Sequence, residues 1–244
     1  MATVGGTPAG KRVPKNTLTG KALTGPGWES RLARLDLGPS DNPKALTLEL
    51  YVVDSLDKHI DRQRLLNERE LPDPPYWALP WIGARAIARR LLANPPGDGV
   101  EALDLGCGLG LAGVAAGLCG CSVTFADYAP ECFAFVEASA RYHGLKNWQL
   151  RELDFCHDRL PTSYDLVLAA DVVYEPESYR PLAEFLDAQT AQNGTILLTE
   201  TLRADASLCL GHLRELGFVD QPSAQWVLED GRRERTWLHE LRRR

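Results

Sequence analysis

Hydrophobic residues recur along the second half of the chain in two alternating patterns. Short apolar runs are typical of buried strands, and they occupy residues 102–105, 122–126, 148–153, 164–170 and 195–199. Between these runs, apolar residues return at helical spacing, as in Leu111, Val114, Ala115 and Leu118. The alternation of strands and helices predicts an α/β fold, in which a mostly parallel sheet carries helices on both faces.

Proline and glycine mark the ends of the predicted helices. Pro130 and Glu131 open a helix after the second strand, because proline suits the first helical position and an acid suits the first turn. Pro176 opens another helix, which we expect to run to residue 188. Gly217 ends the last predicted helix.

The end of the chain carries the signal of a hairpin. Strand-like segments at residues 224–228 and 236–241 flank Asp230-Gly231, a dipeptide that favours a tight turn. The two segments bring the predicted sheet to seven strands. We expect the hairpin to supply an antiparallel strand at the edge of the sheet.

The first hundred residues have a different character. Residues 1–30 are rich in Gly, Thr, Lys and Pro and predict a flexible tail. Residues 45–53 alternate as a strand does, and residues 55–70 are polar and predicted to be helical. Residues 81–92 predict a further helix, with Ile87 and Leu91 one turn apart.

Three arginines of that helix, Arg85, Arg89 and Arg90, are expected to point outward. We divide the chain into a tail at residues 1–30, an N-terminal extension at residues 31–98 and a main domain at residues 99–244.

The composition narrows the classes of function. A chain of 244 residues with 44% hydrophobic and 25% charged residues is an ordinary globular protein, and its net charge of −6 argues against a general nucleic-acid binder. No apolar run is long enough to cross a membrane. The six cysteines lack the spacing of zinc ligands, so we predict no metal site. Reduced thiols indicate the cytoplasm, or the mitochondrial matrix in a eukaryote.

The richest local pattern is a glycine turn after the first strand of the main domain. Asp104 ends the strand, and Gly106, Gly108 and Gly110 follow at alternate positions before a helix. Alternating glycines let the backbone turn tightly and leave bare main chain beside a ligand. The helix N-terminus suits a polar ligand.

Acidic residues follow four of the predicted strands: Asp104, Asp127, Asp154 and Asp171. Ligands of open α/β sheets bind outside the carboxyl ends of the strands, so these acids mark a candidate binding edge. Asp127 lies about 20 residues beyond Gly106, the spacing of a carboxylate that binds ribose hydroxyls.

A second reading of the glycines is open. Gly108, Gly110 and Gly113 match the G-x-G-x-x-G pattern of nicotinamide-dinucleotide-binding proteins. We rank it lower because it leaves Gly106 between the strand and the first required glycine and gives Asp104 no role. The five histidines are also scattered and form no catalytic constellation.

The Asp-x-Gly-x-Gly-x-Gly spacing from Asp104 to Gly110 resembles the first motif of class I S-adenosylmethionine-dependent methyltransferases. The resemblance implies a Rossmann-like, seven-stranded sheet and S-adenosyl-L-methionine as cofactor. It implies that Asp104 approaches the methionine ammonium and that Asp154 and Phe155 border the adenine. The same resemblance assigns four further residues to the cofactor site: Gly106, Tyr128, Ala170 and Trp81.

Two segments resemble protein-lysine methyltransferases. Asp171-Val-Val-Tyr174 is similar to their D-x-x-Y motif, and residues 73–95 resemble the matching segment of the electron-transfer-flavoprotein β-subunit lysine methyltransferases. The chain departs from that pattern at Ile82 and Ala84, where the family prefers Pro and Gly. Asp73-Pro-Pro-Tyr76 resembles the acceptor motif of adenine methyltransferases, but it precedes the glycine turn, so we interpret it as an extended turn.

These resemblances imply methyl transfer to a lysine ε-amine of a protein substrate, such as the electron transfer flavoprotein β subunit. Asp171 and Tyr174 are the implied catalytic residues: Asp171 orients the amine, and Tyr174 with Trp81 lines an aromatic channel. Four alternatives remain: a small-molecule N- or O-methyltransferase with residues 31–80 as a lid, a dinucleotide-binding protein, a non-catalytic binding module and a nucleic-acid methyltransferase. We rank the nucleic-acid methyltransferase lowest because of the acidic net charge and the position of Asp73, and we expect no membrane partner.

Overall fold

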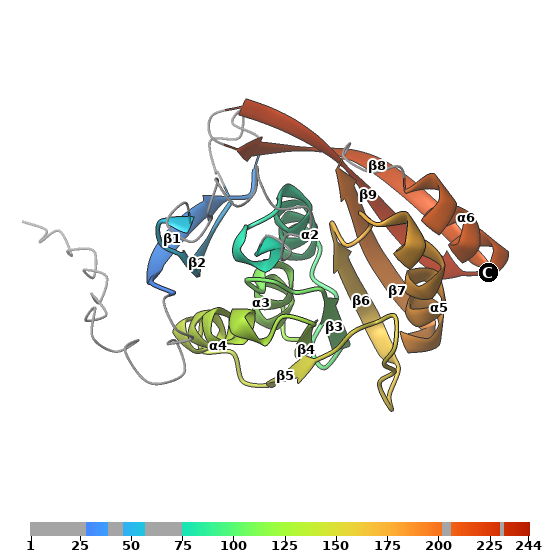
Figure 1. The fold of residues 1–244 in the computed structure, drawn as a ribbon, viewed down its shortest axis with the longest axis horizontal. Helices are drawn as coiled ribbons and strands as arrows, with labels where there is room; N and C mark the ends of the chain where they lie inside the picture. The colour runs from blue at the N-terminus through green and yellow to red at the C-terminus, as the bar shows by residue number, and fades with distance from the viewer. Residues whose placement is uncertain (1–27, 39–45, 57–74, 202–205, 230–231) are drawn as a thin grey trace, which may run out of the picture.

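The computed structural model describes residues 28–38, 46–56, 75–201, 206–229 and 232–244. A seven-stranded sheet forms its centre, and its strands are β3 (Glu101–Leu105), β4 (Ser122–Asp127), β5 (Trp148–Glu152), β6 (Tyr164–Ala170), β7 (Thr190–Thr201), β8 (Phe218–Glu229) and β9 (Arg232–Arg243). They lie in the order β5-β4-β3-β6-β7-β9-β8 (Figure 1). Strands β3 to β7 pair in parallel, and β9 pairs antiparallel with both β7 and β8. The predicted Rossmann-like α/β fold is confirmed.

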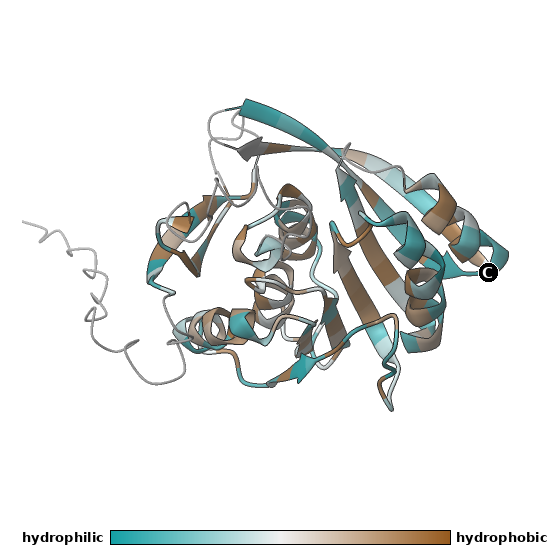
Figure 2. Ribbon diagram, in the orientation of Figure 1, coloured by the Kyte–Doolittle hydropathy of each residue, from teal (hydrophilic) through white to brown (hydrophobic). Residues whose placement is uncertain are grey.

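Helices cover both faces of the sheet. The helices are α2 (Ile82–Ala93), α3 (Leu111–Leu118), α4 (Phe133–Tyr142), α5 (Tyr179–Gln189) and α6 (Ser207–Glu215). Buried residues of α2, α3 and α4 join one apolar cluster, and those of α5 and α6 join another. Alternate strand residues supply the two clusters, because Ala102 belongs to the first and Leu103 to the second. Figure 2 shows this apolar centre along β6 and β7.

Short 3-10 turns precede three of these elements. They are η2 (Tyr76–Ala78), η3 (Pro130–Cys132) and η4 (Pro176–Ser178). The prolines predicted to open helices do so, since Pro130 and Pro176 each begin a turn that runs directly into α4 or α5.

The hairpin supplies the antiparallel edge strand that the sequence predicts, and this strand is β8, the first strand of the hairpin. The strand β9 is internal, because Thr195 pairs with Arg242 on one side and Val219 pairs with the same residue on the other. The connection through α6 leaves one strand position free between β7 and β8. The second strand of the hairpin, β9, occupies that position. The edge strand is therefore β8, and Glu229 pairs with Arg232 across the predicted turn, whose two residues lie outside the described ranges.

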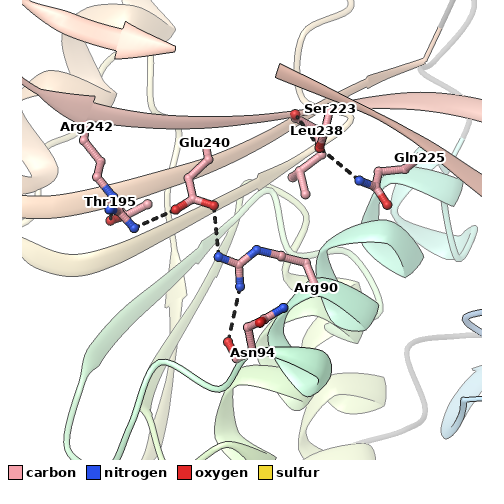
Figure 3. Close-up of polar contacts among 8 residues, drawn as sticks. All are labelled: Arg90, Asn94, Thr195, Ser223, Gln225, Leu238, Glu240 and Arg242. Atoms are coloured by element: carbon pink, nitrogen blue, oxygen red, sulfur yellow. Dashed lines mark hydrogen bonds and ion pairs between the residues drawn. The ribbon is translucent and has the colours of Figure 1, made fainter. Parts of the chain in front are cut away.

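The outward orientation predicted for the arginines of α2 is wrong. Arg85 is buried, with 9% of its surface exposed. Arg89 donates to the carbonyl oxygen of Trp226 at 2.7 Å, and Arg90 forms an ion pair with Glu240 at 3.0 Å (Figure 3). The β8–β9 hairpin arches over α2 and covers the face that the helical pattern alone presents to solvent (Figure 1).

A small antiparallel sheet precedes the main one. It consists of β1 (Ser30–Asp36) and β2 (Thr47–Val53), and β2 confirms the strand predicted near residues 45–53. This sheet packs on α4, where the backbone N–H of Tyr51 donates to Ser139 Oγ at 3.0 Å. The flexible tail and the helix predicted at residues 55–70 fall almost entirely outside the described residues.

The domain division after residue 98 stays a prediction. The helix α2, on its N-terminal side, packs against α3 and the C-terminal strands of the main sheet. Among the described helices, none combines the length and apolar character needed to cross a lipid bilayer.

Candidate active site

A cavity of about 480 Å³ opens at the carboxyl ends of β3, β4 and β6. It collects most of the predicted site residues from different elements. Those that line it are Trp81, Asp104, Gly106, Gly108, Asp127, Tyr128, Phe155, Ala170, Asp171 and Tyr174. Gly110 and Asp154 are not among its lining residues. The volume falls within the range of about 300–1,000 Å³ that is usual for small-molecule sites.

The glycine turn forms the floor of this cavity. Gly106 and Gly108 have φ values of +62° and +49°, which side chains rarely adopt. A Cβ at Gly106 would lie 2.7 Å from Val172 Cγ1, and one at Gly108 would lie 3.0 Å from the carbonyl oxygen of Trp77. Glycine is therefore required by both conformation and space, and the N-terminal extension closes directly over the turn.

Gly110 has a different role from its neighbours. It is the N-cap of α3 with φ +79°, and a Cβ there would lie 3.1 Å from a methyl group of Val136. It lets the turn enter the helix beside α4, so it shapes the site without lining the cavity.

Asp104 is a buried acid at the end of β3. It is 1% exposed, and its Oδ2 accepts the backbone N–H of Gly113 at 2.8 Å. Burial raises the pKa of Asp104 to about 8; the Gly113 N–H opposes this, and the charge of Asp127 adds to it. A cationic group placed at this end of the cavity would favour the ionised carboxylate.

Asp127 ties the end of β4 to the glycine turn. Its Oδ2 accepts the N–H of Gly108 at 2.8 Å, and its Oδ1 accepts the N–H of Ala129 at 3.0 Å. Burial raises the pKa of Asp127, and the backbone N–H groups that bond to it oppose this rise. The carboxylate faces the cavity with a fixed orientation.

The carboxylate of Asp154 bonds to neighbouring residues in the loop after β5. Its Oδ2 lies 2.8 Å from His157 Nδ1 and its Oδ1 accepts the N–H of Cys156, so both oxygens serve the turn after β5. The hydrogen bond from His157 lowers the pKa of Asp154. The next residue, Phe155, turns into the cavity instead, with its ring 6.4 Å from that of Phe185.

Asp171 joins the end of β6 to the start of α2. It has φ +54°, a left-handed conformation that is rare outside glycine, and its Oδ2 accepts the N–H of Gly83 at 2.8 Å. A Cβ at Gly83 would lie 2.2 Å from Thr199 Oγ1 and 2.5 Å from Asp171 Oδ2, so only glycine allows this approach. The first turn of α2 thus holds the carboxylate at the cavity.

Three aromatic rings surround the opening of the cavity, and we call them the aromatic mouth: Tyr76, Trp81 and Tyr174. The Tyr76 ring lies 6.1 Å from Tyr174 and 6.3 Å from Trp81, and Trp81 Nε1 donates to the Tyr76 carbonyl oxygen at 2.8 Å. Tyr76 and Tyr174 remain 42% and 46% exposed. Rings in this position can contact both a ligand in the cavity and a molecule outside it.

Sequence reasoning missed several of the lining residues. Tyr76 was interpreted as part of an extended turn, although its family-like motif was the signal that could have found it. Cys107, Leu153, Val172 and Thr201 also line the cavity. They are apolar or small residues in loops and at strand ends, and nothing in their local pattern separates them from ordinary packing residues.

Comparison with known proteins agrees with the geometry of the cavity. Residues 84–210, more than half of the chain, match the sequence profile of a family described as lysine methyltransferase. The chain belongs to the lysine methyltransferase family.

Relatives within the lysine methyltransferases are moderately similar. The electron transfer flavoprotein β subunit lysine methyltransferase of Xenopus laevis is 32% identical over 172 residues, which cover 67% of this chain and 65% of that protein. Its namesake in Danio rerio is 36% identical over 133 residues, covering 52% and 49%. The mouse protein N-lysine methyltransferase METTL21A is 33% identical over 111 residues, covering 43% and 51%. The matches thus span only about half to two thirds of these relatives.

Solved structures share the fold of this lysine methyltransferase family member at low sequence identity. The N-methyltransferase NodS from Bradyrhizobium japonicum, in complex with S-adenosyl-L-homocysteine, superimposes with a TM-score of 0.56 at 18% identity and covers 74% of this chain and 97% of that one. Magnesium protoporphyrin IX methyltransferase from Synechocystis, with bound SAH, gives 0.55 at 16% identity, covering 76% and 94%.

Proposed function

We propose that this chain transfers a methyl group from S-adenosyl-L-methionine to a lysine ε-amine of a protein. The observation that carries the proposal is one continuous cavity that begins at the glycine turn with Asp104 and Asp127 and ends at Asp171 and the aromatic mouth. Membership of the lysine methyltransferase family supports the same reaction.

The residues of the cavity fit the cofactor. When the cofactor is bound, Asp127 would accept ribose hydroxyls, Asp104 would face the methionine ammonium, and Phe155 and Tyr128 would border the adenine. The buried carboxyl of Asp104 suits a cationic partner, because a cation offsets the cost of ionising it there. When bound, S-adenosyl-L-methionine supplies an activated methyl group, so the protein has mainly to position and desolvate the reactants.

The acceptor lysine must lose its proton before it can attack. With a reference pKa near 10.4, this costs about 4.6 kcal/mol at pH 7. The aromatic mouth lowers the cost, since a low-dielectric surrounding disfavours the ammonium form. Asp171, held by α2, accepts a hydrogen bond from the amine and orients it, and Tyr174 and Trp81 contact the methylene chain.

The names of the relatives suggest which protein acceptor to test first. Several of them are named for the electron transfer flavoprotein β subunit, and we propose this subunit as the first acceptor to test. We also propose a cytoplasmic location, or the mitochondrial matrix in a eukaryote, because all six cysteines are free thiols.

Labelled S-adenosyl-L-methionine, incubated with the protein and either purified electron transfer flavoprotein or a cell lysate, tests the proposal. We expect label on lysine residues of a protein, located by mass spectrometry. Label found in the metabolite fraction alone would refute a protein acceptor and favour a small-molecule methyltransferase.

Asp171→Asn tests the assigned role within the same assay. Asparagine can still accept the Gly83 N–H, but it lacks the charge that orients the amine. A hydrogen bond to a charged group contributes about 1.5–3 kcal/mol, so methylation should fall by about 10- to 150-fold while cofactor affinity is kept. The matched control is Asp154→Asn, because its carboxylate serves only the turn after β5. Full turnover in Asp171→Asn would contradict the assignment.

A further inference from the structure

Two thiols and a carboxylate meet beneath the glycine turn. Cys107 lies within that turn, Asp127 ends β4, and Cys132 lies in η3 just before α4. One ligand atom from each residue, two sulfurs and a carboxylate oxygen, lies within 4.8 Å of the others. The spacing of these residues along the chain matches no zinc pattern, so only the fold brings them together.

We propose that Cys107, Asp127 and Cys132 bind a thiophilic divalent cation of the Zn²⁺ or Cd²⁺ type. Two sulfurs with one carboxylate oxygen are a donor set that suits such ions. With Zn–S bonds of about 2.3 Å and a Zn–O bond of about 2.0 Å, tetrahedral ligand atoms lie about 3.5–3.8 Å apart, so the cluster must contract by about 1.3 Å at most. The fourth position can be filled from the cavity, which Cys107 and Asp127 both line.

The surroundings of the cluster favour a cation. Asp127 and Glu131 are close enough for their negative charge to act on the Cys132 thiol. Burial acts against cation binding, because it raises the pKa of Cys107 and of Cys132 and keeps both thiols protonated in the free protein. A bound cation would therefore displace the two thiol protons to solvent and replace them with a positive charge among acids.

The cation and the cofactor would exclude each other. The carboxylate of Asp127 cannot hold a cation in this cluster and also accept ribose hydroxyls in the orientation that the Gly108 N–H imposes. Cation binding would thus inhibit the protein competitively with the cofactor. This consequence rests on the proposed function, whereas the binding of the cation does not.

Titration of the protein with Cd²⁺, followed by the ultraviolet charge-transfer absorbance of cadmium thiolate, tests the binding. Wild type should bind one more equivalent than Cys132→Ala, a residue that does not line the cavity. The matched control Cys209→Ala removes another buried thiol, in α6, and should keep the wild-type stoichiometry. Equal stoichiometry in wild type and Cys132→Ala would overturn the proposal.

X-ray absorption of the Zn²⁺-loaded wild type provides a measurement that depends on no variant. We expect two sulfur ligands at about 2.3 Å with oxygen ligands in the same shell. A shell of oxygen and nitrogen alone would overturn the proposal even if Cys132→Ala failed to fold.

Competition with S-adenosyl-L-homocysteine tests the exclusion. With free Cd²⁺ at ten times its Kd, the apparent Kd of S-adenosyl-L-homocysteine should rise about elevenfold in wild type and stay unchanged in Cys132→Ala. An unchanged Kd in wild type would refute the exclusion. Failure of S-adenosyl-L-homocysteine to bind metal-free protein would instead count against the proposed function, and the cadmium titration would still decide the metal site.

Discussion

Asp104→Asn should remove the pH dependence of cofactor binding below pH 7. The pKa of Asp104 is raised to about 8, so the carboxyl is mostly neutral at pH 7 in the free protein. Binding of the cofactor ammonium requires the carboxylate, so the affinity of wild type should rise with pH until about pH 8. Asparagine keeps the shape of the side chain and can still accept the Gly113 N–H, but it does not titrate.

The magnitude follows from the ionised fraction. With a pKa of about 8, about one carboxyl in eleven is ionised at pH 7 and about one in a hundred at pH 6. The Kd of wild type for S-adenosyl-L-homocysteine should therefore weaken about ninefold between pH 7 and pH 6. The α-ammonium of the ligand stays charged in this window, so the change belongs to the protein.

Wild type and Asp104→Asn should bind S-adenosyl-L-homocysteine with similar affinity at acidic pH. At pH 6 ionisation of Asp104 costs about 2.7 kcal/mol, which offsets the gain of about 1.5–3 kcal/mol from a charged hydrogen bond. Asp104→Asn should accordingly bind as tightly as wild type near pH 6 and more weakly above pH 7.

Calorimetric titrations from pH 5.5 to pH 7.5 measure these values, with Asp154→Asn as the matched control that should keep the wild-type slope. The pH dependence of the free energy of unfolding provides an independent test of the raised pKa. The raised folded-state pKa makes wild type lose stability relative to Asp104→Asn as the pH rises from about 4 to about 8. A slope that persists in Asp104→Asn, or a wild type without one, would refute the assignment of Asp104 to the ammonium.

Three further variants test other parts of the structure. Gly83→Ala should lower the free energy of unfolding by about 1–3 kcal/mol, because its Cβ would overlap two side-chain oxygens 2.2 and 2.5 Å away. Gly211→Ala lies on a helix, and its Cβ would have no atom within 4 Å, so it should raise the free energy of unfolding by up to about 1 kcal/mol. Chemical denaturation measures both free energies, and equal effects of the two variants would contradict the steric overlap at Gly83. Burial lowers the pKa of His239, but the hydrogen bond that its ring donates to Asp220 and the facing carboxylate of Glu200 together raise it to about 9. Its contribution of about 3 kcal/mol to the free energy of unfolding is therefore complete below pH 6.5 and disappears as the pH rises through 9. Thermal unfolding of His239→Gln should show no such loss, and a retained loss would identify another group. Tyr76→Ala should raise the KM for the protein acceptor by about 2- to 30-fold without changing the cofactor Kd. The control Trp226→Ala, which removes an exposed tryptophan of β8, should change neither value. A changed cofactor Kd in Tyr76→Ala would show that Tyr76 contacts the cofactor and not the acceptor alone.

Local patterns predicted most of the main domain. The strand at residues 164–170 was predicted with the bounds of β6, and Pro130 and Pro176 begin the turns that lead into α4 and α5. Periodicity and helix-end signals act over a few residues, so the sequence alone contains them. The acids at the strand ends were predicted for the same reason, because parallel strands place their carboxyl ends at one edge.

The sequence alone did not predict which way side chains point in the loops that follow the strands. Asp154 and Phe155 are neighbours, yet the loop after β5 turns Phe155 into the cavity and leaves Asp154 bonded to His157. Asp171 was assigned to the acceptor, but its bond to Gly83 became visible only when α2 was placed against β6 and β7.

By itself, the sequence of this protein determined its alternating strands and helices, the glycine turn with Asp104 before it, and the acids at the sheet edge, since each depends on residues close together in the chain. Only the tertiary structure decided that β9 lies inside the sheet, that Arg85 is buried, that Tyr76 joins the aromatic mouth, and that Cys107 meets Cys132. Each of these depends on which distant segment covers a surface, and local periodicity carries no information about that segment.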